Sequence, residues 1–372
     1  ETEMRIGILT LHHALNAGAA LQAWALQTYL QKNGYDAKVV NYGKIGWPFK
    51  YALNFTNLRR FVGSIYYGFR TFFLTFGIES YRRHLFRDFL YSIMCVDRPV
   101  KKEEVLNSAC THFIVGSDQI WNPRIVKKED IYFLPNIKKG VKRIAYAGSF
   151  GVDEFTPRQV RLMQDCFKNF DALSVRETQG AQIIKKLCGR EAEVVCDPTL
   201  LLPAEAYTKI ERRPALSCLP PRYVAVYTVG GHPLAKDAAC RMGARLGIPV
   251  VQLLGGQLAR WYWPWGKVKY ATALGPREWL WFMHHADYVV TNSFHGVIFS
   301  LLFHRPFTAL LNNRPGDARL LTLLEAVGLK KRAVCRPDDE GLSDSVEWSA
   351  VDGNIEEFAR KGKEFLSKAL AR

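Results

Sequence analysis

Short apolar runs alternate with amphipathic stretches along the chain, and this alternation constrains the fold more than any other feature. Arg5–Leu11 is predicted to be a buried strand, and apolar residues between Leu21 and Tyr29 then recur at helical spacing. Asn33-Gly34 ends that helix in the usual C-terminal manner, and Ala37–Tyr42 follows as a second strand. A strand, a helix and a strand in this order favour a parallel sheet with right-handed crossovers.

The same pattern continues in two blocks, which are separated by a proline-containing segment, Glu211–Arg222. The predicted fold class is α/β, with two Rossmann-like domains around a central cleft. The expected boundaries are residues 4–210 for the first domain, 222–350 for the second, and 351–372 for a C-terminal helix that packs back on the first domain. Further strands are expected at His112–Val115, Arg143–Ala147, Ala172–Val175, Glu193–Cys196, Tyr223–Val229, Pro249–Leu254, Asp287–Thr291 and Pro306–Leu311, and later helices at Pro276–His285, Phe294–His304, Ala318–Gly328 and Ile355–Leu370.

One segment, at about residues 44–91, interrupts the first block. It interleaves aromatic and basic residues and contains only two acids, Glu79 and Asp88. Arg70 divides its longest apolar run, which argues against a membrane span. Two interpretations remain open: an amphipathic insertion that contacts an anionic membrane surface, or one that packs on its own domain with its arginines in water.

The net charge of +16 predicts an anionic partner, such as nucleic acid, anionic lipid or a phosphorylated substrate. The sequence has no zinc-finger, RNP-like or helix-turn-helix signature, so we expect no nucleic-acid partner. Eight cysteines at irregular spacings, without a CxxC pair, favour reduced thiols. The first apolar run is short and lacks a basic region before it, so we expect no secretory signal and a cytoplasmic location.

The first motif that could carry chemistry runs from Thr10 to Leu26, where a strand ends, small residues follow and a helix begins. Helix N-termini bind phosphate or carboxylate, and His12, His13 and Asn16 would lie over this one. The same residues also suit a polar turn that caps the helix. The sequence leaves both interpretations open.

A second motif, VGSDQIWNP, follows the predicted strand at His112–Val115. Asp118 is a candidate base toward a sugar hydroxyl. Gln119 and Asn122 are candidates to hydrogen-bond a sugar, and Trp121 is a candidate to stack on a pyranose face. Alternatively, Asp118 only caps the next helix.

Arginines follow two further predicted strands. Arg176, in SVRETQG, stands where a guanidinium suits bidentate recognition of carboxylate or phosphate. Arg314 and Arg319 flank a helix start in the second block, and either is a candidate to hold an anion. For Arg176, a surface pair with Glu177 that has no function is the alternative.

The fourth motif, DYVVTNSFHGVIFSLLFHRPF, places His295 in the first turn of a helix at the end of a strand. A histidine there can donate or accept protons near neutral pH, and Gly296 permits close approach of a ligand. A purely structural histidine is the alternative. The tandem His284-His285 lacks the one-turn spacing of zinc-binding helices, so we expect no metal.

Five segments, taken in order, resemble the polysaccharide pyruvyl transferases: GILTLHHALNAGAALQAWALQ, GSDQIWN, SVRE, CDPTLLL and VVTNSFHGVIFSLLFHRPF. The resemblance extends from Arg5 to about Gly328. It implies a GT-B-like shape and a reaction that builds a pyruvate ketal on a hexose, for which we assume a galactose-like sugar. It also implies phosphoenolpyruvate as co-substrate with no other cofactor, a lipid-linked saccharide as acceptor, and a peripheral position on the inner face of the cytoplasmic membrane.

The resemblance further implies roles for individual residues. His295 matches the family's catalytic histidine, and Arg176 matches an arginine that contacts the donor. Some members have an arginine at the position of Ser293, so here donor binding depends on other cations. The expected donor-binding residues are Arg176, Ser293, Arg314, Arg319, His12 and Asn16, and the expected acceptor-binding residues are His13, Gln119, Trp121 and Asn122, with His295 and Asp118 as catalytic residues.

Two other classes of protein remain open. A GT-B glycosyltransferase would share the fold and the cleft but would bind a nucleotide sugar. A non-catalytic lipid- or glycan-binding protein would retain its ligand when His295 is replaced by alanine.

Overall fold

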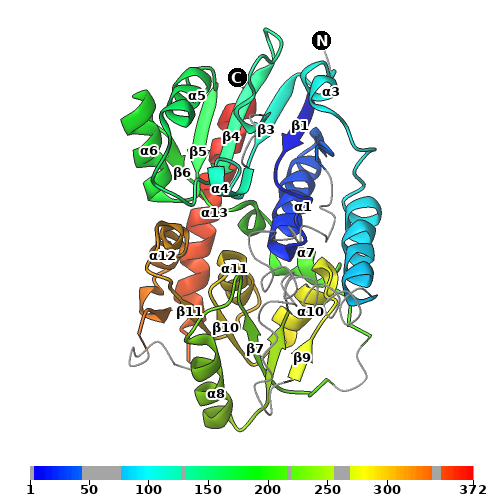
Figure 1. Ribbon diagram of the computed structural model, residues 1–372, viewed down its shortest axis with the longest axis vertical. Coiled ribbons are helices and arrows are strands. Elements are labelled where there is room, and N and C mark those ends of the chain that lie inside the picture. Colours follow the sequence, from blue (N-terminus) through cyan, green and yellow to red (C-terminus); the bar gives the residue numbers. More distant parts are fainter. Residues whose placement is uncertain are drawn as a thin grey trace, which may run out of the picture.

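The computed structural model of the protein describes residues 4–43, 77–126, 131–215, 219–254, 269–336 and 345–371. These residues form two six-stranded parallel sheets with helices packed against them (Figure 1). The alternation of apolar strands and helices along the sequence therefore gives the two α/β domains that it predicts, and the expected fold class is confirmed.

The N-terminal sheet has the strand order β2-β1-β3-β4-β5-β6. After β2 the chain returns to the other side of β1, where β3 pairs with it and His112 lies opposite Ile6. The loops that leave β1 and β3 therefore diverge, and such a switch in strand order creates a crevice for ligands at the carboxyl ends of the strands. The strands are β1 (Arg5–Leu9), β2 (Asp36–Val39), β3 (His112–Val115), β4 (Lys142–Gly148), β5 (Ala172–Val175) and β6 (Glu193–Val194).

The C-terminal sheet repeats this arrangement with the order β12-β11-β10-β7-β8-β9. Its switch lies between β7 and β10, where Thr291 lies opposite Tyr227. Strands β9 and β12 are not predicted from the sequence, because three and two residues are too few for a periodic signal. The strands are β7 (Val224–Tyr227), β8 (Val250–Leu253), β9 (Lys269–Ala271), β10 (Tyr288–Thr291), β11 (Phe307–Leu310) and β12 (Ala333–Val334).

Helices connect the strands, and polar side chains fix where several of them begin. Asn16 and Ser293 each accept a hydrogen bond from the first turn of the helix that follows. In the N-terminal domain these elements are α1 (Ala17–Lys32), a helix at residues 77–88, η1 (Phe89–Ile93), α3 (Lys102–Leu106), α4 (Pro123–Val126), η2 (Ile131–Phe133), α5 (Pro157–Phe167), α6 (Thr178–Cys188), η3 (Pro198–Leu201) and α7 (Ala204–Thr208). Beyond it are α8 (Ala235–Leu246), α10 (Pro276–His285), α11 (Phe294–Leu302), η4 (Pro315–Asp317), α12 (Ala318–Ala326), η5 (Lys330–Arg332) and α13 (Trp348–Ala371).

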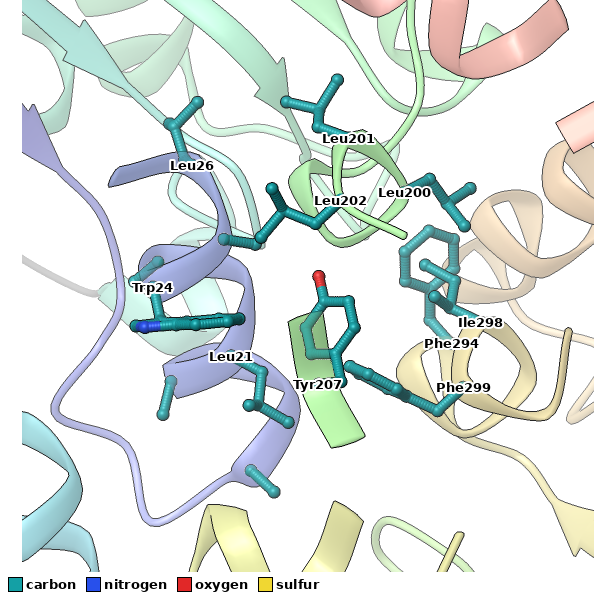
Figure 2. Close-up of a cluster of buried hydrophobic side chains, with 14 of the residues drawn as sticks. Leu21, Trp24, Leu26, Leu200, Leu201, Leu202, Tyr207, Phe294, Ile298 and Phe299 are labelled. Atoms are coloured by element: carbon teal, nitrogen blue, oxygen red, sulfur yellow. The ribbon is translucent and has the colours of Figure 1, made fainter. Parts of the chain in front are cut away.

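A hydrophobic cluster joins the two domains. Figure 2 shows Leu21 and Trp24 of α1 and Phe299 of α11 converging on Tyr207 of α7. The Tyr207 ring packs edge-on against Trp24, with centroids 5.5 Å apart, and against Phe299, with centroids 4.9 Å apart. Burial of side chains of this size contributes roughly 1.5–3 kcal/mol each. The cluster therefore helps to hold the N-terminus of α1 against α11.

The C-terminal helix α13 extends along both domains (Figure 1). At its start Trp348 stacks on His304 of the C-terminal domain, with ring centroids 4.8 Å apart. Toward its end Phe365 packs against Tyr146 of β4. Gly362 makes this approach possible, because a Cβ there would lie 2.5 Å from the Tyr146 hydroxyl. The helix thus contacts the N-terminal sheet.

The aromatic and basic segment lies partly outside the described residues, which resume at residue 77, so the expected membrane contact stays a prediction. In the described part, Arg82 is buried, donates to the carbonyl oxygen of Leu15 and pairs with Glu79 at 3.7 Å. Arg83 pairs with the same carboxylate at 3.6 Å. These two arginines are therefore engaged within the protein. None of the helices in the described ranges is long and apolar enough to cross a membrane.

Candidate functional site

Loops from both domains bring four ionisable side chains together between the sheets. Asp118 and Arg176 follow β3 and β5, Asp197 stands just after β6, and His295 opens α11 after β10. Ion pairs connect Arg176 to both carboxylates, and His295 lies beside one of them. The expected convergence at the carboxyl ends of the strands thus occurs for these residues.

Arg176 is the centre of this cluster. Its side chain has no exposed surface; Nη2 lies 3.1 Å from Oδ1 of Asp118, and Nη1 lies 3.0 Å from Oδ2 of Asp197. Burial opposes its charge, but the two carboxylates raise the pKa of Arg176 above its ordinary value. We expected Arg176 to contact an anionic donor. Both ends of the guanidinium pair with carboxylates, so Arg176 holds Asp118 and Asp197 in position, and its contact with an anionic donor stays a prediction.

Asp197 is fully buried and fixed in one orientation. Ser117 Oγ donates to Oδ2 at 2.8 Å, and Thr199 donates to Oδ1 from its backbone nitrogen at 3.1 Å and from Oγ1 at 2.7 Å. Burial alone would raise the pKa of this carboxyl group, but His295, Arg176 and the bond from Thr199 hold that pKa well below its usual range. The carboxylate is therefore charged at neutral pH.

His295 faces this carboxylate from the other domain. Its Nε2 lies 3.6 Å from Oδ2 of Asp197, and Ser293 fixes the helix start by accepting a hydrogen bond from the backbone nitrogen of Gly296 at 3.3 Å. The imidazole packs so closely on α1 that a Cβ at Gly18 would lie 2.3 Å from its Cγ and Nδ1. Nε2 is buried and has no hydrogen-bond partner. This arrangement suits proton transfer to a bound ligand.

Arg319 of α12 adds a cation beside the cluster. Burial and the neighbouring Arg176 lower the pKa of Arg319 to about 10, which leaves its guanidinium charged at neutral pH. Glu177 and Asp118 act on it as opposing charges. Burial raises the pKa of the Glu177 carboxyl group above its ordinary value. The C-terminal domain thus presents a charged arginine to the site.

The other two anion-binding candidates of that domain, Arg314 and Ser293, do not add a charge beside Arg176. Arg314 is exposed at the start of η4. Ser293 caps α11 and carries no charge. Of these three residues, Arg319 is the one that electrostatic interactions connect to Arg176 and Asp118.

Trp121 is not available to a sugar, and this corrects our expectation. Its side chain is 3% exposed, and its ring packs among Phe133, Phe150 and Phe167. Its Nε1 donates to the carbonyl oxygen of Tyr132 at 3.1 Å. The indole belongs to the core of the N-terminal domain, because the apolar residues that surround it leave it no face toward solvent.

Gln119 and Asn122 bond to each other, with Nδ2 of Asn122 lying 2.6 Å from Oε1 of Gln119. Asn122 is buried, and its Oδ1 also accepts a hydrogen bond from the backbone nitrogen of Arg124. Gln119 is half-buried in the loop that carries Asp118. The acceptor-binding roles of Gln119 and Asn122 stay predictions.

Of the histidines that follow β1, His12 is buried and His13 is half-buried. His12 is buried, with Nδ1 3.0 Å from the carbonyl oxygen of Thr10 and Nε2 3.4 Å from Oδ1 of Asn41. Burial lowers the pKa of His12, and burial together with His12 lowers the pKa of His13 to about 3. The ring of His12 is enclosed and both of its nitrogens lie beside oxygen atoms of the protein, so donor binding by His12 stays a prediction. The roles of His13 and Asn16 stay predictions, although Asn16 caps α1.

Sequence reasoning missed two residues of the site. Asp197 stands in CDPTLLL, where an aspartate followed by Pro198 and Thr199 is a helix-start signal that implies a fixed carboxylate. The sequence around Gly18 gives no such signal, because glycine is needed at this position only to make room for His295 of the other domain.

Comparisons with known proteins bear on the family and the fold. A family model described as polysaccharide pyruvyl transferase matches residues 16–314. No protein with a curated description matches the sequence. The structure of a UDP-N-acetylglucosamine 2-epimerase from Listeria monocytogenes is similar at a TM-score of 0.50 and 10% identity, over 97% of this chain and 91% of that one.

Two further solved structures are also similar. The UDP-GlcNAc 2-epimerase from Methanocaldococcus jannaschii has a TM-score of 0.46 at 10% identity, over 98% of this chain and 99% of that one. The glycosyltransferase SnogD from Streptomyces nogalater has a TM-score of 0.45 at 13% identity, over 99% of each chain. At such identities, likeness in structure concerns the fold alone, which is GT-B-like.

Proposed function

The chain belongs to the polysaccharide pyruvyl transferase family, and we propose that it transfers the enolpyruvyl group of phosphoenolpyruvate onto a hexose of a lipid-linked polysaccharide precursor. The product is a cyclic pyruvate ketal, and phosphate is released. Membership in the family supports the general reaction, and the site between the two domains supports its assignment to particular residues.

The observation that carries the proposal is the position of His295. Its Nε2 is buried without a hydrogen-bond partner, while the charged Asp197 lies 3.6 Å away. An imidazole that is held in one orientation within reach of a ligand is an effective general acid. His295 is therefore the acid that protonates C3 of phosphoenolpyruvate, and Asp197 positions it.

Arg319 supplies the charge that Ser293 lacks. Phosphoenolpyruvate carries a carboxylate and a phosphate, and an arginine binds either group through paired N–H donors. Arg319 stays charged beside Asp118 and Arg176, whereas Ser293 is occupied as a helix cap. Arg319 therefore binds the anionic donor and stabilises the phosphate as it leaves.

The reaction proceeds in steps that balance without a redox change. Protonation of C3 by His295 creates an oxocarbenium-like centre at C2, and a sugar hydroxyl adds to C2 as Asp118 accepts its proton. The C2–O bond to phosphate then breaks, and phosphate leaves with its bonding electron pair. The second hydroxyl adds to the regenerated centre at C2, gives its proton to the His295 imidazole that the first step left neutral, and closes the ketal.

The acceptor binds on the opposite side of the donor from His295 in this proposal. Gln119 and Asn122, in the loop that carries Asp118, offer amide groups for sugar hydroxyls, and His13 is a further neutral donor or acceptor. The lipid end of the precursor would keep the enzyme at the inner face of the cytoplasmic membrane, where the basic and aromatic segment at about residues 44–91 contacts anionic headgroups.

The test measures phosphate release from phosphoenolpyruvate with a panel of lipid-linked or synthetic galactosides, glucosides and mannosides. We expect release that depends on one acceptor, with a product heavier by one pyruvyl ketal. His295→Ala should lower kcat about 1,000-fold, since general acid catalysis contributes roughly 100- to 10,000-fold. Arg319→Met should raise KM for phosphoenolpyruvate about tenfold or more.

Arg314→Met distinguishes the two arginines of this segment, because Arg314 is exposed. A larger effect at Arg314 than at Arg319 would transfer donor binding to Arg314. If no acceptor supports phosphate release and the protein binds a UDP- or GDP-sugar that phosphoenolpyruvate does not displace, the glycosyltransferase alternative replaces the proposal.

A further inference from the structure

A second group of ionisable side chains lies apart from the catalytic cluster, at the C-terminal end of α10. His284 and His285 are the last two residues of that helix, and Glu211 comes from the segment that connects the domains. One ligand atom from each of the three lies within 4.8 Å of the others. None of the three belongs to the site between the sheets.

We propose that Glu211, His284 and His285 bind a divalent transition-metal ion of the zinc class. Imidazole nitrogens and a carboxylate oxygen are common ligands of Zn²⁺ in proteins, and three protein ligands leave a fourth position for water. The end of the helix adds to this preference, because its terminal carbonyl groups give it a partial negative charge that favours a cation.

The hydrogen bonds of the two histidines suit this role. Nδ1 of His285 bonds to the carbonyl oxygen of Trp281 at 2.9 Å, which fixes the ring and leaves Nε2 as the free ligand atom. A second bond of this kind is typical of histidines that bind metals. Nδ1 of His284 already lies 2.9 Å from Oε2 of Glu211. An entering ion displaces the shared proton and takes both atoms as ligands.

The surroundings hold the ligands in place and leave one side open. The His285 ring stacks on Trp281 with centroids 4.3 Å apart, and the His284 ring lies 4.7 Å from that of Phe303. The backbone nitrogen of Glu211 is bonded to the carbonyl oxygen of Tyr207 at 3.0 Å. A cavity of about 440 Å³, lined in part by His285 and Trp281, lies beside one of the three ligands.

This inference differs from the expectation drawn from the sequence. Adjacent histidines do not share a helix face, and on that ground we expected no metal. The third ligand, Glu211, lies far from the histidines in sequence, and the last turn of α10 is where the two rings approach each other, with centroids 4.7 Å apart. A bound ion would connect the interdomain segment to α10.

The test uses the full chain without an affinity tag, dialysed against EDTA and titrated with Zn²⁺ by calorimetry and with Co²⁺ by visible absorption. We expect one ion per chain and the Co²⁺ absorption bands typical of a four-coordinate site. His285→Gln and Glu211→Gln should each weaken Zn²⁺ binding about 100-fold or more. Zn²⁺ should also raise the melting temperature of the wild type and not of these variants.

His304→Gln is the matched control. His304 also stacks on a tryptophan, Trp348, and bonds to a carboxylate oxygen, that of Asp352, at 2.8 Å. Among the residues that the structure describes, no third metal-ligating group joins this pair. The substitution His304→Gln should leave the binding of one Zn²⁺ ion per chain unchanged. Melting curves in EDTA establish that each variant is folded. Absence of saturable binding in the wild type, or equal binding in His285→Gln and the wild type, would overturn the assignment.

Discussion

Two strand-to-helix junctions, β1 to α1 and β10 to α11, each place histidine beside the start of a helix, yet only one of these histidines faces an acid. After β1, His12 and His13 pack against each other with ring centroids 4.0 Å apart. After β10, His295 lies 3.6 Å from the buried carboxylate of Asp197. The junctions are similar in sequence character and differ in what the rest of the fold places opposite them.

The difference in electrostatics follows from those partners. Burial and the neighbouring imidazole lower the pKa of His13 to about 3, so His13 is neutral at pH 7. At the second junction Asp197 is held charged by Arg176 and by hydrogen bonds from Ser117 and Thr199. Of the two junctions, the one after β10 thus has a fixed charge opposite its histidine, and a distant loop supplies that charge.

The largest expected effect comes from removing that charge. Asp197→Asn keeps the size of the side chain but takes away the carboxylate that positions His295 and pairs with Arg176. We expect kcat to fall about 100- to 1,000-fold. The free energy of unfolding, measured with urea, should fall by about 3 kcal/mol, because a buried cation loses one of its partners.

Asp352→Asn is the control for this change. Asp352 also pairs with a histidine, His304, at 2.8 Å, but its side chain is 42% exposed. Solvent screens such a pair, so its loss should cost less than about 1 kcal/mol and leave kcat unchanged. Equal effects of the two substitutions on kcat would mean that Asp197 does not act on His295.

A smaller effect is expected where the two junctions touch. Gly18 of α1 lies against the imidazole of His295, and Gly18→Ala would add a Cβ 2.3 Å from its Cγ. Displacement of a catalytic group by about 1 Å can cost roughly 100-fold in rate, so we expect kcat to fall about 10- to 100-fold. Steady-state kinetics measure this loss.

Gly353→Ala in α13 is the control that distinguishes the loss of the Gly18–His295 contact from the general effect of replacing a helical glycine by alanine. No atom lies within 4 Å of the position that a Cβ would take at Gly353. This control should raise the free energy of unfolding by about 0.5–1 kcal/mol without changing kcat. Full activity of Gly18→Ala would mean that His295 does not need this contact.

The fold could be predicted from the sequence because its signals are local. Apolar runs such as His112–Val115 and Ala172–Val175 coincide with strands β3 and β5 in the structure. The first strand ends at Leu9 rather than at Leu11, since boundaries depend on where hydrogen bonding to neighbouring strands stops. The short strands β9 and β12 are not predicted, whereas the two-residue strand β6 lies inside the predicted strand Glu193–Cys196.

The site could be predicted only where a residue's position along its own element decides its role. His295 follows a strand and opens a helix, and both facts are visible in the sequence. Trp121 also follows a strand, but packing against Phe133, Phe150 and Phe167 places it in the core. The partners of Arg176 come from separate loops, so its positioning role depends on tertiary structure.

The smallest expected effect on activity belongs to the junction after β1. The pKa of His13 is about 3 in the folded chain and about 6.5 in the unfolded one, so between these values only the unfolded chain binds the proton. The contribution of His13 to the free energy of unfolding is therefore fully present above about pH 6.5, and it is lost as the pH decreases below this value. His13→Gln removes this term, and its free energy of unfolding should fall by about 2 kcal/mol less than that of the wild type between pH 7.5 and 5. Urea denaturation at the two pH values measures the difference, and kcat at pH 7.5 should change less than about threefold because a neutral amide replaces a neutral imidazole. Identical pH dependence of the two proteins would mean that His13 is protonated in the folded chain, and the contrast between the two junctions would then rest on Asp197 alone.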